Sequence, residues 1–115
     1  MTPRYSSSYE RDNVKDFSQT VRGLEMNASV RLSVVINVNE ATRVITSYSG
    51  PYLESLWMDA GPYLVWLTDI STSQSLSSSR RTLYCEGSFR IHAETYLAMD
   101  VHETILFTIK LNASI

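Results

Sequence analysis

The stretch Ala28-Ser29-Val30-Arg31-Leu32-Ser33-Val34-Val35-Ile36-Asn37-Val38 decides most of the fold. Apolar side chains occupy Val30 and every second position after it up to Val38, and mostly polar side chains lie between them. A period of two is typical of a half-buried β-strand, whose successive side chains point to opposite faces of a sheet. Val35 interrupts the polar face, so we expect part of this strand to be covered on both sides.

Three later stretches also predict strands. Residues 63–70 are almost continuously apolar and aromatic, which is typical of a central strand covered on both faces. Residues 83–91 alternate as well, with Gly87 as an expected bulge or bend that interrupts the alternation. Residues 105–111 alternate in the same way and predict a closing strand near the end of the chain.

A helix is predicted between the first two strands. Pro51 suits a first helical turn, and Leu53, Leu56 and Trp57 recur at three- and four-residue spacing. We expect this helix to cover residues 51–60 and to end before Gly61.

Other connecting segments carry weaker signals. Residues 40–49 suit either a short helix or a strand, and we favour the helix. The Ser-rich residues 71–79 show no apolar period and predict a flexible surface loop. Residues 93–99 predict a weak helix or a loop. Together these elements predict an α+β fold, in which a single antiparallel β-sheet of four to five strands packs against one or two helices.

The predicted domain organisation is one globular domain with a polar extension. Residues 1–20 are rich in Ser, Tyr, Arg and Asp and hold few groups that could be buried, so we expect a flexible N-terminal arm. Residues 21–115 form the predicted globular α+β domain. The chain has 43% hydrophobic and 19% charged residues, which is ordinary globular usage.

Charge and cysteine content narrow the functional classes. The net charge of −2, with no basic run longer than Arg80-Arg81, gives no support for tight nonspecific nucleic-acid binding by a monomer. Cys85 is the only cysteine, so no internal disulfide can form and a reducing compartment is expected. The sequence has neither the apolar core of a signal peptide nor a stretch long enough for a membrane span. We therefore expect an intracellular protein that is neither secreted nor membrane-spanning.

The residue types that carry catalysis do not form recognisable motifs. Cys85, His92 and His102 match no metal-ligand spacing, and Cys85 follows Leu83 in the alternating pattern of a strand, where a free cysteine is commonly a small buried hydrophobe. The carboxylates are scattered, and the four glycines are isolated, so neither an acid–base pair nor a phosphate-binding loop is predicted. We expect no catalytic residue, no metal, no cofactor and no small-molecule substrate.

Binding is the remaining interpretation. Aromatic residues are dense between Tyr48 and Trp66, and an exposed Tyr52 or Trp57 would anchor an interface, because Trp, Tyr and Arg dominate binding hot spots. Arg80 and Arg81 follow the predicted flexible loop, where their guanidinium groups could reach a phosphate, an acidic lipid or a carboxylate patch. These four residues are the predicted interaction site.

Short motifs follow one another in a defined order along residues 28–115. The polar arm and the alternating strand precede a predicted Leu-x-x-Leu-Trp helix, a long aromatic strand, a flexible loop, a Cys-Glu-Gly triplet with a downstream His, and a Thr-Ile-rich closing strand. The residues concerned are Leu53, Leu56, Trp57, Asp59, residues 63–68, Cys85, Glu86, Gly87, His92 and residues 104–109. In this order of elements the chain resembles the globular core of rhabdovirus matrix proteins.

The resemblance implies a non-enzymatic viral structural and assembly protein. Such a protein would self-associate into a homo-oligomer and bind viral ribonucleoprotein, membrane or host factors, with weak contact to nucleic acid or to anionic membrane. The alternative is a small intracellular adaptor module in which sheet aromatics and Arg residues hold a single nucleic-acid strand or a peptide.

Overall fold

The computed structural model describes residues 6–115, and its first sheet is built around the strand that the sequence predicts best. Strand β2 (Leu24–Asn39) lies between β1 (Ser6–Val21) and β3 (Val44–Asp59), and all three are antiparallel. The side chains at even positions of β2, from Met26 to Val38, are buried, and those at odd positions are half-buried or exposed. The predicted alternating strand is therefore confirmed.

The second sheet has β5 (Thr82–Glu94) at its centre. Strand β4 (Leu64–Leu76) pairs with one side of β5, while β6 (Val101–Glu103) and β7 (Phe107–Ser114) follow one another along its other side. A short 3-10 turn, η1 (Tyr96–Ala98), connects β5 to β6. The predicted strands over residues 83–91 and 105–111 are confirmed as β5 and, from Phe107 onward, as β7.

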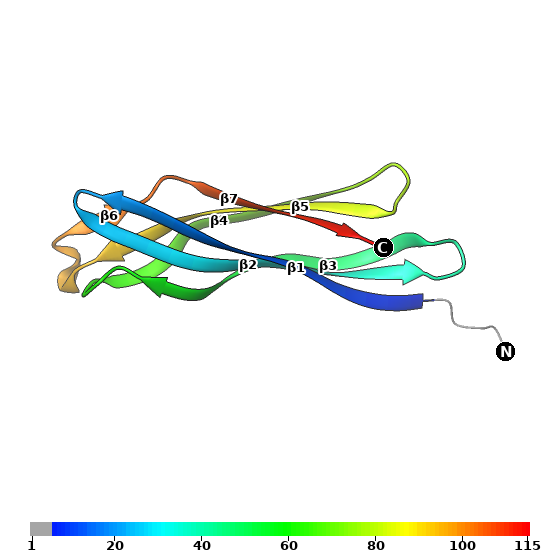
Figure 1. Ribbon diagram of the computed structural model, residues 1–115, viewed down its shortest axis with the longest axis horizontal. Coiled ribbons are helices and arrows are strands. Elements are labelled where there is room, and N and C mark those ends of the chain that lie inside the picture. The colour runs from blue at the N-terminus through cyan, green and yellow to red at the C-terminus, as the bar shows by residue number, and fades with distance from the viewer. Residues whose placement is uncertain (1–5) are drawn as a thin grey trace.

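The two sheets pack face to face and bury the core between them (Figure 1). Phe17 of β1 contacts Phe89 of β5 and Phe107 of β7, with ring centroids 4.9 and 5.1 Å apart. Gly87 does not mark a bulge, because its pairing with both neighbouring strands is continuous. A Cβ atom at Gly87 would lie 2.5 Å from a methyl carbon of Leu53, so glycine is needed there for close packing of the sheets.

The predicted α+β class is wrong, because the described chain is a sandwich of two sheets without an α-helix. The predicted helix over residues 51–60 lies in β3. Register shifts in the β2–β3 pairing, one of them beside Leu56, break the period of two. Leu53 consequently faces the core, while Leu56 and Trp57 are exposed. The bulges produce three- and four-residue spacings in an extended strand, which explains the wrong prediction.

Four further expectations change. Residues 6–20 of the predicted flexible arm form β1, and residues 1–5 lie outside the described part of the chain. The helix favoured for residues 40–49 is a turn followed by the start of β3. The strand predicted over residues 63–70 is β4, which is an edge strand because it pairs only with β5. The predicted loop over residues 71–79 is strand as far as Leu76.

The sandwich is long and narrow, and the edges at β3, β4 and β7 are protected. Its principal extents are 64 × 26 × 18 Å. Side chains of β1 cover the open edge of the opposite sheet: Asn13 donates a hydrogen bond to the Lys110 carbonyl at 2.8 Å, and Gln19 accepts one from the Ile105 amide at 2.8 Å. Bulges interrupt β3 and β4 at the other edges. Such devices oppose strand-to-strand pairing with another chain. Within residues 6–115 no helix is long and apolar enough to cross a membrane.

Candidate interaction site at the apolar end

The four residues predicted to form an interaction site lie in two separate regions. Tyr52 and Trp57 belong to β3 and are 58% and 57% exposed. Arg80 and Arg81 lie in the β4–β5 turn, where the Arg80 carbonyl accepts a hydrogen bond from the Ile45 amide at the start of β3. Trp57 is twelve residues further along that strand, or roughly 40 Å at the usual rise of a strand. The structure therefore does not bring the four residues together.

Trp57 lines a shallow hollow on the outer face of the first sheet. The hollow has a volume of about 410 Å³ and is bordered by Asp16 and Ser18 of β1 and by Asn27 of β2. An exposed indole beside a carboxylate and an amide offers both an apolar surface and hydrogen-bonding groups. Trp57 is therefore exposed, and its role in an interaction stays a prediction.

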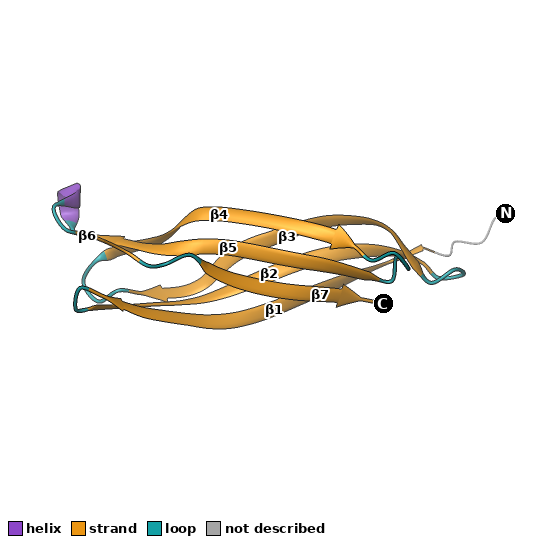
Figure 2. Cartoon of the chain, turned by 90° about the horizontal axis from the view of Figure 1, so that it is seen from above, coloured by secondary structure: helices purple, strands orange, loops and turns teal. Residues whose placement is uncertain are grey.

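The most exposed apolar side chains occur together at one end of the long axis. Tyr96, Leu97 and Met99 are 80%, 75% and 83% exposed, and all three belong to the β5–β6 connection. Figure 2 shows η1 protruding beyond the strands at this end of the molecule. Leu64 and Val101, which flank Glu94 on the neighbouring strands, are also exposed at the base of the connection. We call Leu64, Tyr96, Leu97, Met99 and Val101 the apolar end.

The turn that carries these side chains is closed by its own hydrogen bonds. The Ala98 amide donates to the Thr95 carbonyl at 2.9 Å, and the Thr95 amide donates to the Asp100 carbonyl at 3.0 Å. The Asp100 amide donates to the Thr95 hydroxyl at 2.9 Å. Leu97 and Ala98 have φ angles of 65° and 53°, a left-handed backbone that is uncommon for residues other than glycine. The apolar side chains are thus presented by a defined turn.

A polar network joins this turn to the body of the sandwich. The Asp100 carboxylate accepts a hydrogen bond from the Tyr63 hydroxyl at 2.6 Å and lies 3.1 Å from Nε2 of the buried His102. The other ring nitrogen, Nδ1, lies 2.8 Å from the carbonyl of Val21, the last residue of β1 before the β1–β2 turn. Nη2 of Arg22 lies 3.6 Å from Oδ1 of Asp100, and the same nitrogen donates a hydrogen bond to the Val101 carbonyl. Three connections of the chain are therefore held together beneath the apolar end.

The pKa values of this network follow from its hydrogen bonds. The bond from the Tyr63 hydroxyl, together with that from His102, holds the pKa of Asp100 below its ordinary value. The same contact with Asp100 raises the pKa of Tyr63, because ionised tyrosine would face a carboxylate. Asp100 consequently remains an acceptor at neutral pH and keeps the turn anchored.

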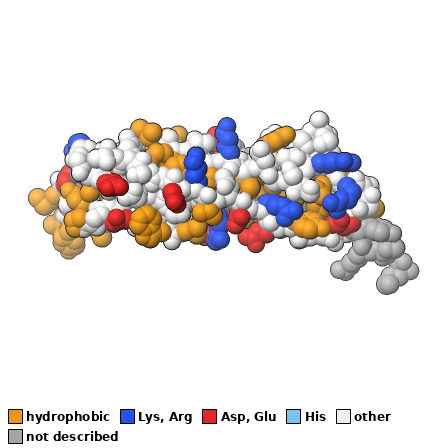
Figure 3. Space-filling model, viewed as in Figure 1, with side chains coloured by type: hydrophobic (Ala, Val, Ile, Leu, Met, Phe, Trp, Pro, Cys, Tyr) orange, Lys and Arg blue, Asp and Glu red, His pale blue; other side chains and the backbone are white. Residues whose placement is uncertain are grey.

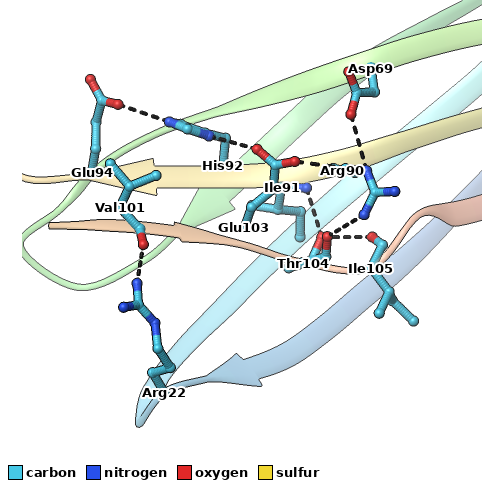
Figure 4. Close-up of polar contacts among 10 residues, drawn as sticks. All are labelled: Arg22, Asp69, Arg90, Ile91, His92, Glu94, Val101, Glu103, Thr104 and Ile105. Atoms are coloured by element: carbon cyan, nitrogen blue, oxygen red, sulfur yellow. Dashed lines mark hydrogen bonds and ion pairs between the residues drawn. The ribbon is translucent and has the colours of Figure 1, made fainter. Parts of the chain in front are cut away.

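A second polar cluster lies on the outer face of the second sheet (Figure 4). The His92 ring lies between two carboxylates, with Nε2 2.9 Å from Glu94 and Nδ1 2.9 Å from Glu103. These hydrogen bonds, chiefly the one with Glu94, raise the pKa of His92. Arg90 also belongs to the cluster, because its Nε atom lies 3.0 Å from the Asp69 carboxylate and 3.8 Å from the Glu103 carboxylate. The arrangement joins β4, β5 and β6 by cross-strand charge pairs.

The side chains considered for catalysis are either buried in the core or paired with carboxylates. Cys85 is buried in the core as predicted, and burial raises the pKa of its thiol, which opposes formation of a thiolate. His92 and His102 have carboxylate partners. In the described part of the chain no cluster of three or more His, Cys, Asp or Glu side chains is placed to hold a metal ion.

No family model, no curated protein and no solved structure matches this chain. The apolar end was missed by the sequence interpretation. Tyr96, Leu97 and Met99 fit neither a period of two nor a helical period, and the only signal was that large apolar residues occupy a segment without a predicted element.

Proposed function

We propose that this protein is a non-enzymatic assembly module of the matrix-like kind implied by the resemblance to rhabdovirus matrix proteins. It would act by binding other molecules through its surface, and the apolar end would be its principal anchor. The single observation that carries the proposal is the exposure of Tyr96, Leu97 and Met99, at 75–83%, on one hydrogen-bonded turn. Contiguous exposed apolar groups of this kind commonly mark sites of protein or membrane interaction.

The shape of the apolar end limits what can cover it. The turn protrudes from the end of the sandwich, so a flat protein surface would contact only its tip (Figure 2). A lipid surface accommodates a protruding apolar turn, and Tyr96 has the amphipathic ring that is favoured at a membrane–water interface. A concave groove on a viral or host protein is the other surface that fits.

The proposed anchor is tested by the double substitution Leu97→Ser/Met99→Ser in the full chain. Flotation with phosphatidylcholine vesicles and sedimentation velocity at rising protein concentration would be compared with the unchanged protein. We expect binding, of vesicles or of other copies, to weaken about tenfold or more, because each large apolar side chain contributes roughly this factor when it is buried.

A matched control is Ile70→Ser, which removes an exposed apolar side chain from β4 at a distance from the apolar end. This variant should bind as the unchanged protein does. A protein that stays monomeric and ignores vesicles, or a loss of binding that is equal in both variants, would remove the proposal.

The alternative of a nucleic-acid-binding module has one supporting observation, the exposed rings of Tyr52 and Trp57. The first sheet's outer face around these rings carries more carboxylates than basic groups, including Asp16 and Glu54. A polyanion would be repelled there. We therefore favour protein or lipid contact over nucleic acid.

A further inference from the structure

The outer face of the first sheet concentrates negative charge. Because the even side chains of β2 are buried, its odd side chains and the paired positions of β1 and β3 point outward. These outward positions hold six carboxylates and one guanidinium, or a net charge of −5, whereas the whole chain carries −2. The carboxylates are Glu10, Asp12, Asp16, Glu25, Glu54 and Asp59, and the guanidinium is that of Arg31. We call this surface the acidic face.

The surroundings of Arg31 reflect this concentration. Its Nε atom donates a hydrogen bond to Glu54 at 2.8 Å across the β2–β3 pair. The hydrogen bond with Glu54, its negative charge and the charges of Asp12 and Glu10 raise the pKa of Arg31. One cation is thus shared by several carboxylates, and the acidic face retains a surplus of negative charge.

The end of the sandwich opposite the apolar end is basic. The β2–β3 turn carries Arg43, which pairs with Glu40, and the β4–β5 turn carries Arg80 and Arg81. The hydrogen bond from the Ile45 amide to the Arg80 carbonyl, at 2.7 Å, holds the two turns side by side. Figure 3 shows Lys and Arg side chains gathered toward this end and apolar side chains at the other.

Arg80 and Arg81 are available for an external partner. Arg80 Nη2 reaches only the Ile45 carbonyl, at 3.4 Å, and within residues 6–115 neither guanidinium has a carboxylate partner. Both side chains are exposed. An arginine fork binds carboxylates and stacks on aromatic rings, and the hollow beside Trp57 offers both, with Asp16 on one side and the indole on the other.

We propose that the acidic face binds the basic end of a second copy of this chain, with Arg81 seated between Asp16 and Trp57. This inference rests on the proposed assembly function and specifies the contact that would build the assembly. The two surfaces differ, so each bound copy still offers a free acidic face or a free basic end, and such a heterologous contact continues into open chains. Pairing of strand edges is opposed as a competing route at β3 and β4, which are bulged, and at the β7 edge, which side chains of β1 cover.

The contact should be weak and sensitive to salt. The basic end is limited by the cross-section of the sandwich, 26 × 18 Å, so the contact belongs among small interfaces. Attraction between exposed charges is largely screened at high ionic strength. We expect concentration-dependent association near about 20 mM salt that is lost near about 0.5 M salt.

The test is a charge exchange followed by sedimentation velocity of the full chain. Arg81→Glu alone and Asp16→Lys alone should each weaken low-salt association about tenfold, because each places like charges opposite one another. Arg81→Glu combined with Asp16→Lys restores an opposite pair and should recover most of the association. Circular dichroism would verify that each variant retains its strands.

A control of equal net charge separates the contact from general repulsion. Arg81→Glu/Glu86→Lys has the same net charge as the exchanged pair, but Glu86 is exposed on β5 of the second sheet, away from the acidic face. This variant should stay as weak as Arg81→Glu.

Recovery in the Glu86 control, unchanged association in the single variants or a strict monomer at low salt would each overturn the inference. Association that is lost in Leu97→Ser/Met99→Ser, and not in the charge variants, would overturn it as well while supporting the proposed apolar anchor. Vesicle binding that depends on the apolar end, without any self-association, would likewise overturn this inference and support the proposed apolar anchor.

Discussion

The buried hydroxyl of Thr104 completes an interrupted edge of the second sheet. It lies between β6 and β7, is 2% exposed, and its amide donates to the Ile91 carbonyl at 3.0 Å. Its hydroxyl oxygen accepts a hydrogen bond from the Ile91 amide and donates one to the Ile105 carbonyl, both at 2.9 Å. The side chain thus replaces a backbone partner at the break in the strand.

Replacing this hydroxyl should destabilise the protein measurably. Thr104→Val keeps the shape of the side chain but leaves the buried Ile91 amide without a partner, which costs about 1–3 kcal/mol. Equilibrium urea unfolding measures the loss. Thr108→Val, at an exposed position of β7, is the matched control and should change the free energy of unfolding by no more than about 0.5 kcal/mol. Equal effects in the two variants would contradict the role of the Thr104 hydroxyl.

The strands differ in how clearly the sequence predicts them. Strands β2 and β5 are central, so one complete face of each is buried and the period of two is nearly strict. Strand β1 is an edge strand whose inward positions include Arg11, Asn13 and Lys15. Asn13 and Arg11 bind carbonyls of β7 instead of entering the core. The alternation that identifies a strand is therefore absent, and the segment was predicted to be a flexible arm.

Strand β3 and the apolar end show two other limits of the sequence. Bulges in β3 interrupt its alternation of apolar and polar residues, so the apolar residues recur at the three- and four-residue spacing of a helix. At the apolar end, Tyr96, Leu97 and Met99 have no period, and only tertiary structure decides whether such residues are buried or exposed. The acidic face could not be predicted without the strand register either, because its carboxylates come from three different strands.

The cross-strand cluster around His92 should make stability depend on pH. Hydrogen bonds with Glu94 and Glu103 raise the pKa of His92 in the folded protein, so folded His92 holds its proton more tightly than unfolded His92. This contribution is complete below the ordinary value of about 6.5 and is lost as the pH rises through the raised folded pKa. Folded protein should consequently lose stability as the pH rises from about 6.5 through the raised folded pKa of His92.

His92→Gln should remove the contribution of His92 to the dependence of the free energy of unfolding on pH. Urea unfolding of both proteins across this pH range gives the comparison. The lowered pKa values of Asp100 and Glu40 affect stability in acid, and the raised pKa of Cys85 does so in alkali, so all three act outside the range. An identical pH slope in the two proteins would show that the Glu94 and Glu103 contacts do not hold the proton.

The whole molecule is far more extended than its length requires. A strand of sixteen residues is about 53 Å long at the usual rise, while each sheet is only about three strands wide. The Cα radius of gyration is accordingly 18.1 Å, compared with about 13 Å for a compact domain of this length. Length matters for the proposed assembly, because it separates the basic end from the apolar end and leaves the acidic face between them.

Small-angle X-ray scattering tests this shape and its consequence together. Near about 0.5 M salt, where surface charges are screened, we expect a monomer with a radius of gyration close to that of the extended sandwich. At low salt the apparent radius should rise with protein concentration, because a basic end bound to the face of the next copy lengthens the particle. A high-salt radius near about 13 Å would contradict the long continuous strands. A high-salt radius that agrees with the sandwich, but with no increase at low salt, would leave the fold intact and count against the charged contact alone.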